Sequence, residues 1–136
     1  MAVQCGRVNF PAKIPPLLGA LLLALLLGAC SPNVPTAKRG AIDFYRDGQM
    51  TSSRVMTEPE ARAVSAWFQA HGSGWSRSQV SDAPATLIRL RHSDRETTMI
   101  NLFGNTVVVT SSGGQFRKTL SPQETADLRA LAGIGP

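Results

Sequence analysis

An uncharged apolar run near the N-terminus determines which part of this chain can belong to a folded domain. Residues 17–29 are thirteen consecutive uncharged residues, and the charged side chains before them are Arg7 and Lys13. As a helix rising 1.5 Å per residue, the run covers about 20 Å, whereas the hydrocarbon core of a bilayer is about 30 Å thick. A run of this length after a basic stretch is typical of a secretory signal that is removed from the mature chain. An uncleaved membrane anchor is the alternative.

The end of this run carries a more specific pattern. Leu27, Gly28, Ala29 and Cys30 follow one another, and this sequence resembles the lipobox of bacterial lipoproteins. The resemblance covers residues 1–31 and implies cleavage between Ala29 and Cys30, followed by acylation of the Cys30 sulfur and of the new amino group. A thiolate is well suited to forming that thioether. The membrane lipid would then be attached through Cys30.

The same resemblance implies a location in the cell envelope. Two or more fatty acyl chains hold a protein firmly on a membrane, whereas one chain holds it only marginally. In lipoproteins of Gram-negative bacteria, an Asp after the acylated cysteine tends to retain the protein in the inner membrane, and here Ser31 stands at that place. The resemblance therefore implies the outer membrane, facing the periplasm, and a Gram-positive surface would also fit.

Removal of residues 1–29 changes the charge and the cysteine content of what remains. The mature chain of 107 residues has 12 basic and 9 acidic side chains, so most of the excess positive charge disappears and nucleic acid is not an expected partner. Its single cysteine is Cys30, so the domain has no disulfide to rely on. Residues 30–40 include two prolines and few apolar side chains, and we expect the acylated cysteine and a flexible tether there. The remaining residues, 41–136, are expected to form one small domain.

Two capping boxes predict where helices begin. Thr57 and Glu60 form the first, and the helix after it is expected to end at residues 72–74 because of their two glycines. Ser121 and Glu124 form the second, at the start of a helix near the C-terminus.

Alternating apolar and polar residues predict the strands. The pattern is found at 41–46, more weakly at 50–56, and then at 86–91, 97–103, 106–110 and 116–120. Short turns separate the last four segments, which favours hairpins. We therefore expect an α+β fold: a small antiparallel meander sheet of about four to six strands with two helices packed on one face.

No pattern in the sequence predicts a reaction, a metal site or a cofactor. The histidines, His71 and His92, are 21 positions apart, and no metal-binding motif includes them. We interpret His71 as a C-terminal capping residue, because a helix dipole favours a cation there, and His92 as a solvated turn residue. An enzyme that uses one of them as a base, with a nearby Asp, is the alternative.

Candidate binding residues lie on the strands and after the first helix. Arg89 and Arg91 are two positions apart, so they share one face of a strand. With Arg95, Arg117 and Lys118 they form a possible basic stripe, which would meet an acidic partner or an anionic polymer. The alternative is an ordinary solvated strand face.

A tryptophan follows the glycines that end the first helix. Trp75 is either an anchor for a partner or a lid on the core.

These observations together predict a membrane-anchored envelope lipoprotein that is not an enzyme and that binds another envelope component, either an envelope protein or an anionic polymer. Inhibition of an envelope hydrolase is the alternative. Residues 112–116, Ser-Gly-Gly-Gln-Phe, resemble a Ser-Gly-x-x-Tyr loop of lipoproteins that inhibit lysozyme, with Phe in place of Tyr and without the disulfide common in those proteins.

Overall fold

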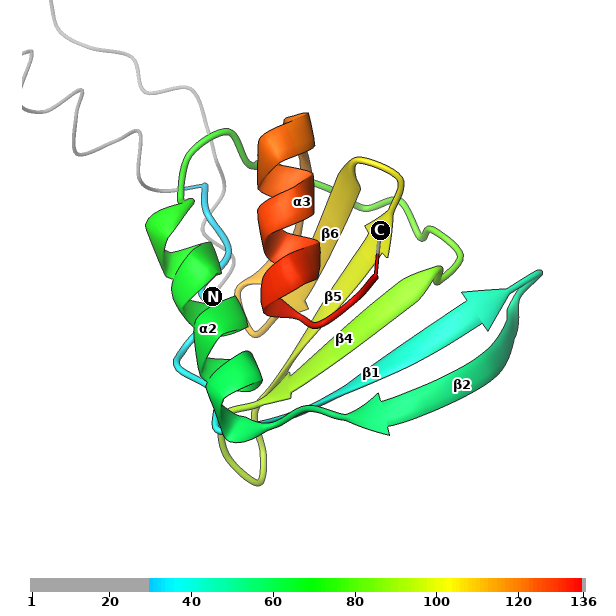
Figure 1. Ribbon diagram of the computed structural model, residues 1–136. Coiled ribbons are helices and arrows are strands. Elements are labelled where there is room, and N and C mark those ends of the chain that lie inside the picture. Colours follow the sequence, from blue (N-terminus) through cyan, green and yellow to red (C-terminus); the bar gives the residue numbers. More distant parts are fainter. Residues whose placement is uncertain (1–29, 136) are drawn as a thin grey trace, which may run out of the picture.

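The computed structural model describes residues 30–135, which form one antiparallel sheet with two helices on one face (Figure 1). The predicted α+β class is confirmed. The sheet has seven strands, slightly more than the expected four to six. The predicted signal region lies outside the described residues. Within the described part of the chain, no helix is long and apolar enough to cross a membrane.

The strands and helices follow one another along the chain in a simple order. They are β1 (Arg39–Arg46), β2 (Gln49–Val55), α2 (Glu58–Ala70), β3 (Ser76–Arg77), β4 (Thr86–Arg91), β5 (Thr97–Phe103), β6 (Thr106–Ser111), β7 (Gly114–Thr119) and α3 (Pro122–Leu131). The spatial order is β2-β1-β4-β5-β6-β7-β3. Strands β4 to β7 therefore form the predicted meander, while β1 joins it beside β4 and the short β3 joins it beside β7.

Both helices begin at the predicted caps. At α2, the backbone N–H of Glu60 donates to the Thr57 hydroxyl at 3.4 Å, and the Thr57 N–H donates to the Glu60 carboxylate at 2.8 Å. Ser121 and Glu124 make the same reciprocal pair at α3, at 3.1 and 2.8 Å. These bonds satisfy backbone donors that have no partner inside the helix.

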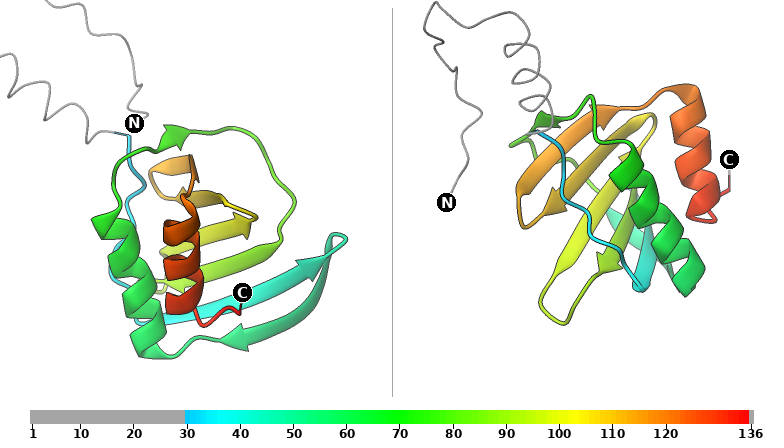
Figure 2. Two further views of the ribbon diagram at one scale, coloured as in Figure 1. Left: turned by 45° about the horizontal axis from the view of Figure 1, so that its top comes forward. Right: turned by 90° about the vertical axis from the view of Figure 1, so that its left-hand side faces the viewer.

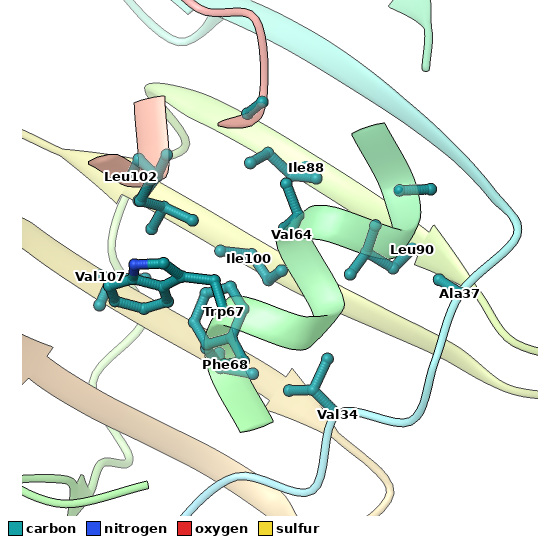
Figure 3. Close-up of a cluster of buried hydrophobic side chains, with 14 of the residues drawn as sticks. Val34, Ala37, Val64, Trp67, Phe68, Ile88, Leu90, Ile100, Leu102 and Val107 are labelled. Carbon is teal, nitrogen blue, oxygen red and sulfur yellow. The ribbon is translucent and has the colours of Figure 1, made fainter. Parts of the chain in front are cut away.

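The core lies between the sheet and the helices. Ile42, Ile88, Ile100 and Val109 stand opposite one another on four neighbouring strands, and all four are fully buried. Side chains of α2, including Val64 and Phe68, pack on this row (Figure 3). Because successive side chains of a strand point to opposite faces, every second residue of β1 and β4 is left on the face without helices.

The expected flexible tether is not what the structure shows. Val34 and Ala37 are only 3% and 0% exposed, and the segment that carries them runs beside α2 (Figure 2). The side-chain amide of Gln69 donates to the Val34 carbonyl at 3.0 Å, and the Ala37 N–H donates to the Ser65 hydroxyl at 3.1 Å. The prediction was wrong because Val34 and Ala37 pack into the core and Pro32 is buried with them, although the prolines and the few apolar side chains suggested a flexible segment. The folded unit thus begins before residue 41.

Candidate functional site

Arginines gather on the face of the sheet that no helix covers. Arg89 and Arg91 are both exposed and lie on this face, as their spacing predicts, while their neighbours Ile88 and Leu90 are buried. On the next strand, Arg39 stands directly opposite Arg91. The preceding Lys38 is also exposed. We call Lys38, Arg39, Arg89 and Arg91 the basic cluster.

Two hollows open among these side chains. The first, of about 250 Å³, is lined by Arg39, Gly40, Ala41, Arg89, Arg91 and Thr97. The second, of about 210 Å³, is lined by Lys38, Arg39, Arg91, His92, Ser93 and Asp94. Arg39 and Arg91 border both hollows, so they are the centre of the cluster.

One arginine of the cluster already has a counterion. Arg89 Nε lies 2.8 Å from Asp43 Oδ2, and the Ser53 hydroxyl donates to the same carboxylate at 2.6 Å. Burial works to raise the pKa of Asp43, but the hydrogen bonds from Ser53 and Arg89 and the charge of Arg89 outweigh it, so this pKa lies below its ordinary value. Within residues 30–135, Lys38, Arg39 and Arg91 form no ion pair.

The other basic residues of the predicted stripe lie elsewhere. Arg117 is three strands away on β7 and pairs with Asp82 at 3.0 Å. Lys118 pairs with Glu124 at 2.9 Å and is largely buried. Lys118 was wrongly placed in the stripe, because two successive residues of a strand cannot point to the same face. Arg95 is exposed in the turn after β4.

Lys38 and Arg39 were not predicted to belong to the basic stripe. They were expected in the tether, whereas Arg39 is the first residue of β1. Their approach to Arg91 depends on the pairing of β1 with β4, and α2 separates these strands in the sequence. No local pattern around Lys38 carries that information.

Trp75 is the lid rather than an exposed anchor. It is 8% exposed, its indole N–H donates to the His71 carbonyl at 2.7 Å, and its ring lies 5.9 Å from that of Phe68. A partner contact through Trp75 would need this segment to move.

The two histidines do not form a catalytic pair with a carboxylate. His71 is the C-cap of α2, as predicted; its Nδ1 lies 2.7 Å from the Trp67 carbonyl oxygen and its ring stacks on the Trp67 indole. His92 is half-buried rather than solvated, and its Nε2 lies 2.8 Å from the Thr98 hydroxyl oxygen. In the described part of the chain, neither ring is hydrogen-bonded to a carboxylate, which is the group that would orient a general base.

The segment with a likeness to an inhibitor loop does not present its aromatic residue. Phe116 is 3% exposed and belongs to the core, and the Gln115 side chain donates to the Val80 carbonyl at 2.6 Å. Only the residues at the β6–β7 turn, Ser112 and Gly113, are exposed.

An apolar groove of about 610 Å³ runs beside α3, with walls that include Pro122, Ala126, Ala130 and Ile134. The one charged residue in its walls, Arg129, donates to the Gly135 carbonyl. The polar side chains of Asn105 and Thr125 complete its walls. No three side chains that could hold a metal ion come together among residues 30–135.

Comparison with protein-family models, with curated proteins and with solved structures found no match to the chain.

Proposed function

We propose that this chain is a membrane-anchored envelope lipoprotein, not an enzyme, whose domain binds another envelope component. The observation that carries the proposal is the sequence Leu27-Gly28-Ala29-Cys30 at the end of the apolar run. Diacylation or triacylation at Cys30 would anchor the domain firmly. With Ser31 next to it, the outer membrane is the proposed location.

The packing of the first described residues supports a short connection to the lipid. Ser31 lies beside Gly72, at the end of α2, and the chain is buried at Pro32 and again at Val34. Only a few residues thus separate the proposed acylation site from the folded domain. Such a short connection would keep the C-terminal end of α2 close to the membrane.

The basic cluster is the proposed contact surface. Three of its residues, Lys38, Arg39 and Arg91, are exposed and form no ion pair within residues 30–135. Arg39 and Arg91 lie on the sheet face that no helix covers, and Lys38 borders the second hollow just before β1. Arginine side chains are frequent at binding surfaces because the guanidinium group donates several hydrogen bonds in a fixed plane.

Mass spectrometry of the membrane-extracted protein tests the anchor. We expect an N-terminal Cys30 with at least two acyl chains and no residues 1–29, and we expect Cys30→Ala to remain unprocessed. Ser31→Asp should move the protein from the outer to the inner membrane. A chain that keeps residues 1–29 and an unacylated Cys30 contradicts the proposal.

Cross-linking in the native membrane tests the binding role. We expect one envelope component to be recovered with the acylated protein and to be lost with Arg91→Gln. A turnover activity that disappears when His71 or His92 is changed to Ala would show an enzyme instead. Slowing of lysozyme at stoichiometric excess would show an inhibitor.

A further inference from the structure

We propose that Arg39 and Arg91, with Lys38 beside them, form a binding site for an anionic polymer that carries repeated carboxylate or phosphate groups. The proposed function names an envelope component without its chemistry, and this inference supplies it. The choice of an envelope polymer rests on the proposed location, but the anion site itself rests only on the geometry of the basic cluster.

The first observation is a pair of like charges that the fold forces together. Arg39 and Arg91 are direct partners on neighbouring antiparallel strands, where Cβ atoms of opposite residues are about 4.5–5.5 Å apart. Like charges in this arrangement oppose folding. The carboxylate nearest to them on β1, Asp43, is already held by Arg89 and Ser53. An anion bound between Arg39 and Arg91 would remove the repulsion.

The second observation is the shape and chemistry of the two hollows. They share Arg39 and Arg91, so neighbouring anionic groups of one polymer can occupy both. A guanidinium group binds a carboxylate or a phosphate through two parallel hydrogen bonds. The first hollow has no apolar side chain larger than Ala41, and protein partners usually need a buried aromatic or aliphatic anchor. The hollows therefore fit a polyanion better than an acidic protein.

One residue of the second hollow works against an anion. Asp94 lies there with Lys38, Arg39 and Arg91, and it forms no ion pair within residues 30–135. Its carboxylate repels an anionic group that enters the second hollow. Removal of this charge should therefore increase the affinity for an anionic polymer, whereas removal of Arg39 or Arg91 should decrease it.

The third observation is the position of the cluster relative to Cys30. Ser31 lies beside Gly72 at the C-terminal end of α2, whereas the Gly40 carbonyl accepts from the Met56 N–H just before the helix begins (Figure 2). The segment from Ser31 to Gly40 thus runs along the whole of α2, which is about 20 Å long at 1.5 Å per residue. Electrostatic attraction to headgroups is screened within about 8 Å at physiological salt. With Cys30 at the membrane and α2 pointing away from it, the cluster would lie beyond the range of this attraction and would be open to a polymer.

Binding of a fluorescent oligogalacturonate, a chain of repeated carboxylates, tests the site directly. The full chain in detergent is titrated with it at 150 mM salt, beside a neutral glucose oligomer of the same length. We expect Arg39→Gln and Arg91→Gln each to weaken binding at least tenfold, and Asp94→Asn to tighten it severalfold. The matched control is Arg46→Gln, which removes the same charge from the exposed far end of β1. It should change the affinity less than twofold.

Several results would overturn the proposal. Equal losses for Arg46→Gln and Arg91→Gln, or binding of the neutral oligomer, would show that the cluster is not a specific site. Binding of anionic vesicles but not of the oligomer would assign the cluster to lipid. A protein cross-linked through a photoreactive residue at Thr97, without oligomer binding, would assign it to a protein partner. A polyphosphate of the same length, in a parallel titration, tells phosphate from carboxylate.

This test separates the site from the anchor. The Cys30→Ala chain should bind the oligomer like the unchanged chain, because Cys30 is at the other end of α2. Missing acylation together with oligomer binding that Arg91→Gln abolishes would refute the proposed function alone. Normal acylation without oligomer binding would refute the polymer site alone. A melting curve of each variant shows that a loss of binding is not a loss of fold.

Discussion

At the level of single residues, Glu60 links three parts of the molecule. Its carboxylate accepts two hydrogen bonds from the Arg54 guanidinium group, both at 3.1 Å, and one from the Thr57 N–H at 2.8 Å. Arg54 also donates to the Ala132 carbonyl at the end of α3. The edge strand β2 and the ends of both helices thus depend on one carboxylate.

This arrangement predicts a loss of stability in acid. The hydrogen bonds from Arg54 and from the Thr57 backbone lower the pKa of Glu60 from 4.5 to about 2. A carboxylate whose pKa is lower in the folded chain stabilises it above pH 4.5, and this contribution disappears as the pH falls toward 2. We expect Glu60→Gln to lower the free energy of unfolding at pH 7 by about 1.5–3 kcal/mol, the range for hydrogen bonds to charged groups. Urea denaturation from pH 7 to pH 2 should show the difference narrowing below pH 4.5.

Glu58→Gln is the matched control for this prediction. Glu58 precedes Glu60 by two residues and pairs with Arg62, with about half of each side chain exposed. Exposed pairs four residues apart on a helix contribute about 0.3–0.5 kcal/mol. A Glu60→Gln effect as small as that of Glu58→Gln would mean that the Arg54 contacts do not stabilise the fold.

The repulsion between Arg39 and Arg91 predicts a substitution that stabilises the protein. Arg91→Gln removes one of the two charges and keeps the length of the side chain, so we expect the free energy of unfolding to rise by about 0.2–1 kcal/mol. High salt should reduce the gain, because it screens the charges in the unchanged chain. Chemical denaturation at low and high salt measures both effects. A clear loss of stability would show that Arg91 makes a structural contribution of its own.

At the level of secondary structure, the elements that the sequence predicted are those with a local cause. Each helix start depends on a cap and a residue three positions later, Thr57 with Glu60 and Ser121 with Glu124. The meander follows from short turns between alternating segments. The place of β1 beside β4 has no local cause, because it depends on burying Ile42 against Ile88 across the intervening helix.

The same distinction explains how much of the candidate site was predictable. The spacing of Arg89 and Arg91 placed them on one face, and β4 confirms it. Arg39 could be added only through the long-range pairing of β1 with β4. The two arginines of the cluster that lie on one strand, Arg89 and Arg91, were thus predictable from the sequence.

The packed segment before β1 predicts different effects for two neighbouring substitutions. Val34→Asp would place a charge without a partner in the core, which costs about 3–5 kcal/mol in comparable cases. Asn33→Asp adds the same charge at an exposed position and should change the free energy of unfolding by less than about 0.5 kcal/mol. Urea denaturation of the two variants measures the difference. Equal stability would mean that the segment behaves as the flexible tether that its prolines suggested.

At the level of the whole molecule, the fold separates two ends along the axis of α2. Cys30 and Ser31 lie near the end of the helix, while the basic cluster lies near its start. Because the connecting segment is packed rather than free, the distance between the ends is built into the fold. An acylated Cys30 would then hold the cluster away from the membrane.

This geometry predicts how two positions respond to a quencher attached to lipid headgroups. Ser73 follows α2 near Cys30, and Ser93 lies in the turn beside the cluster; both are exposed. Fluorophores are attached to Ser73→Cys and to Ser93→Cys in the mature acylated protein, where the thioether keeps Cys30 unreactive. The helix separates the positions by about 20 Å. We therefore expect strong quenching at residue 73 and weak quenching at residue 93 on vesicles, and none at either position in a Cys30→Ala chain. Equal quenching at both positions would mean that the domain lies flat, with Arg39 and Arg91 within reach of the headgroups.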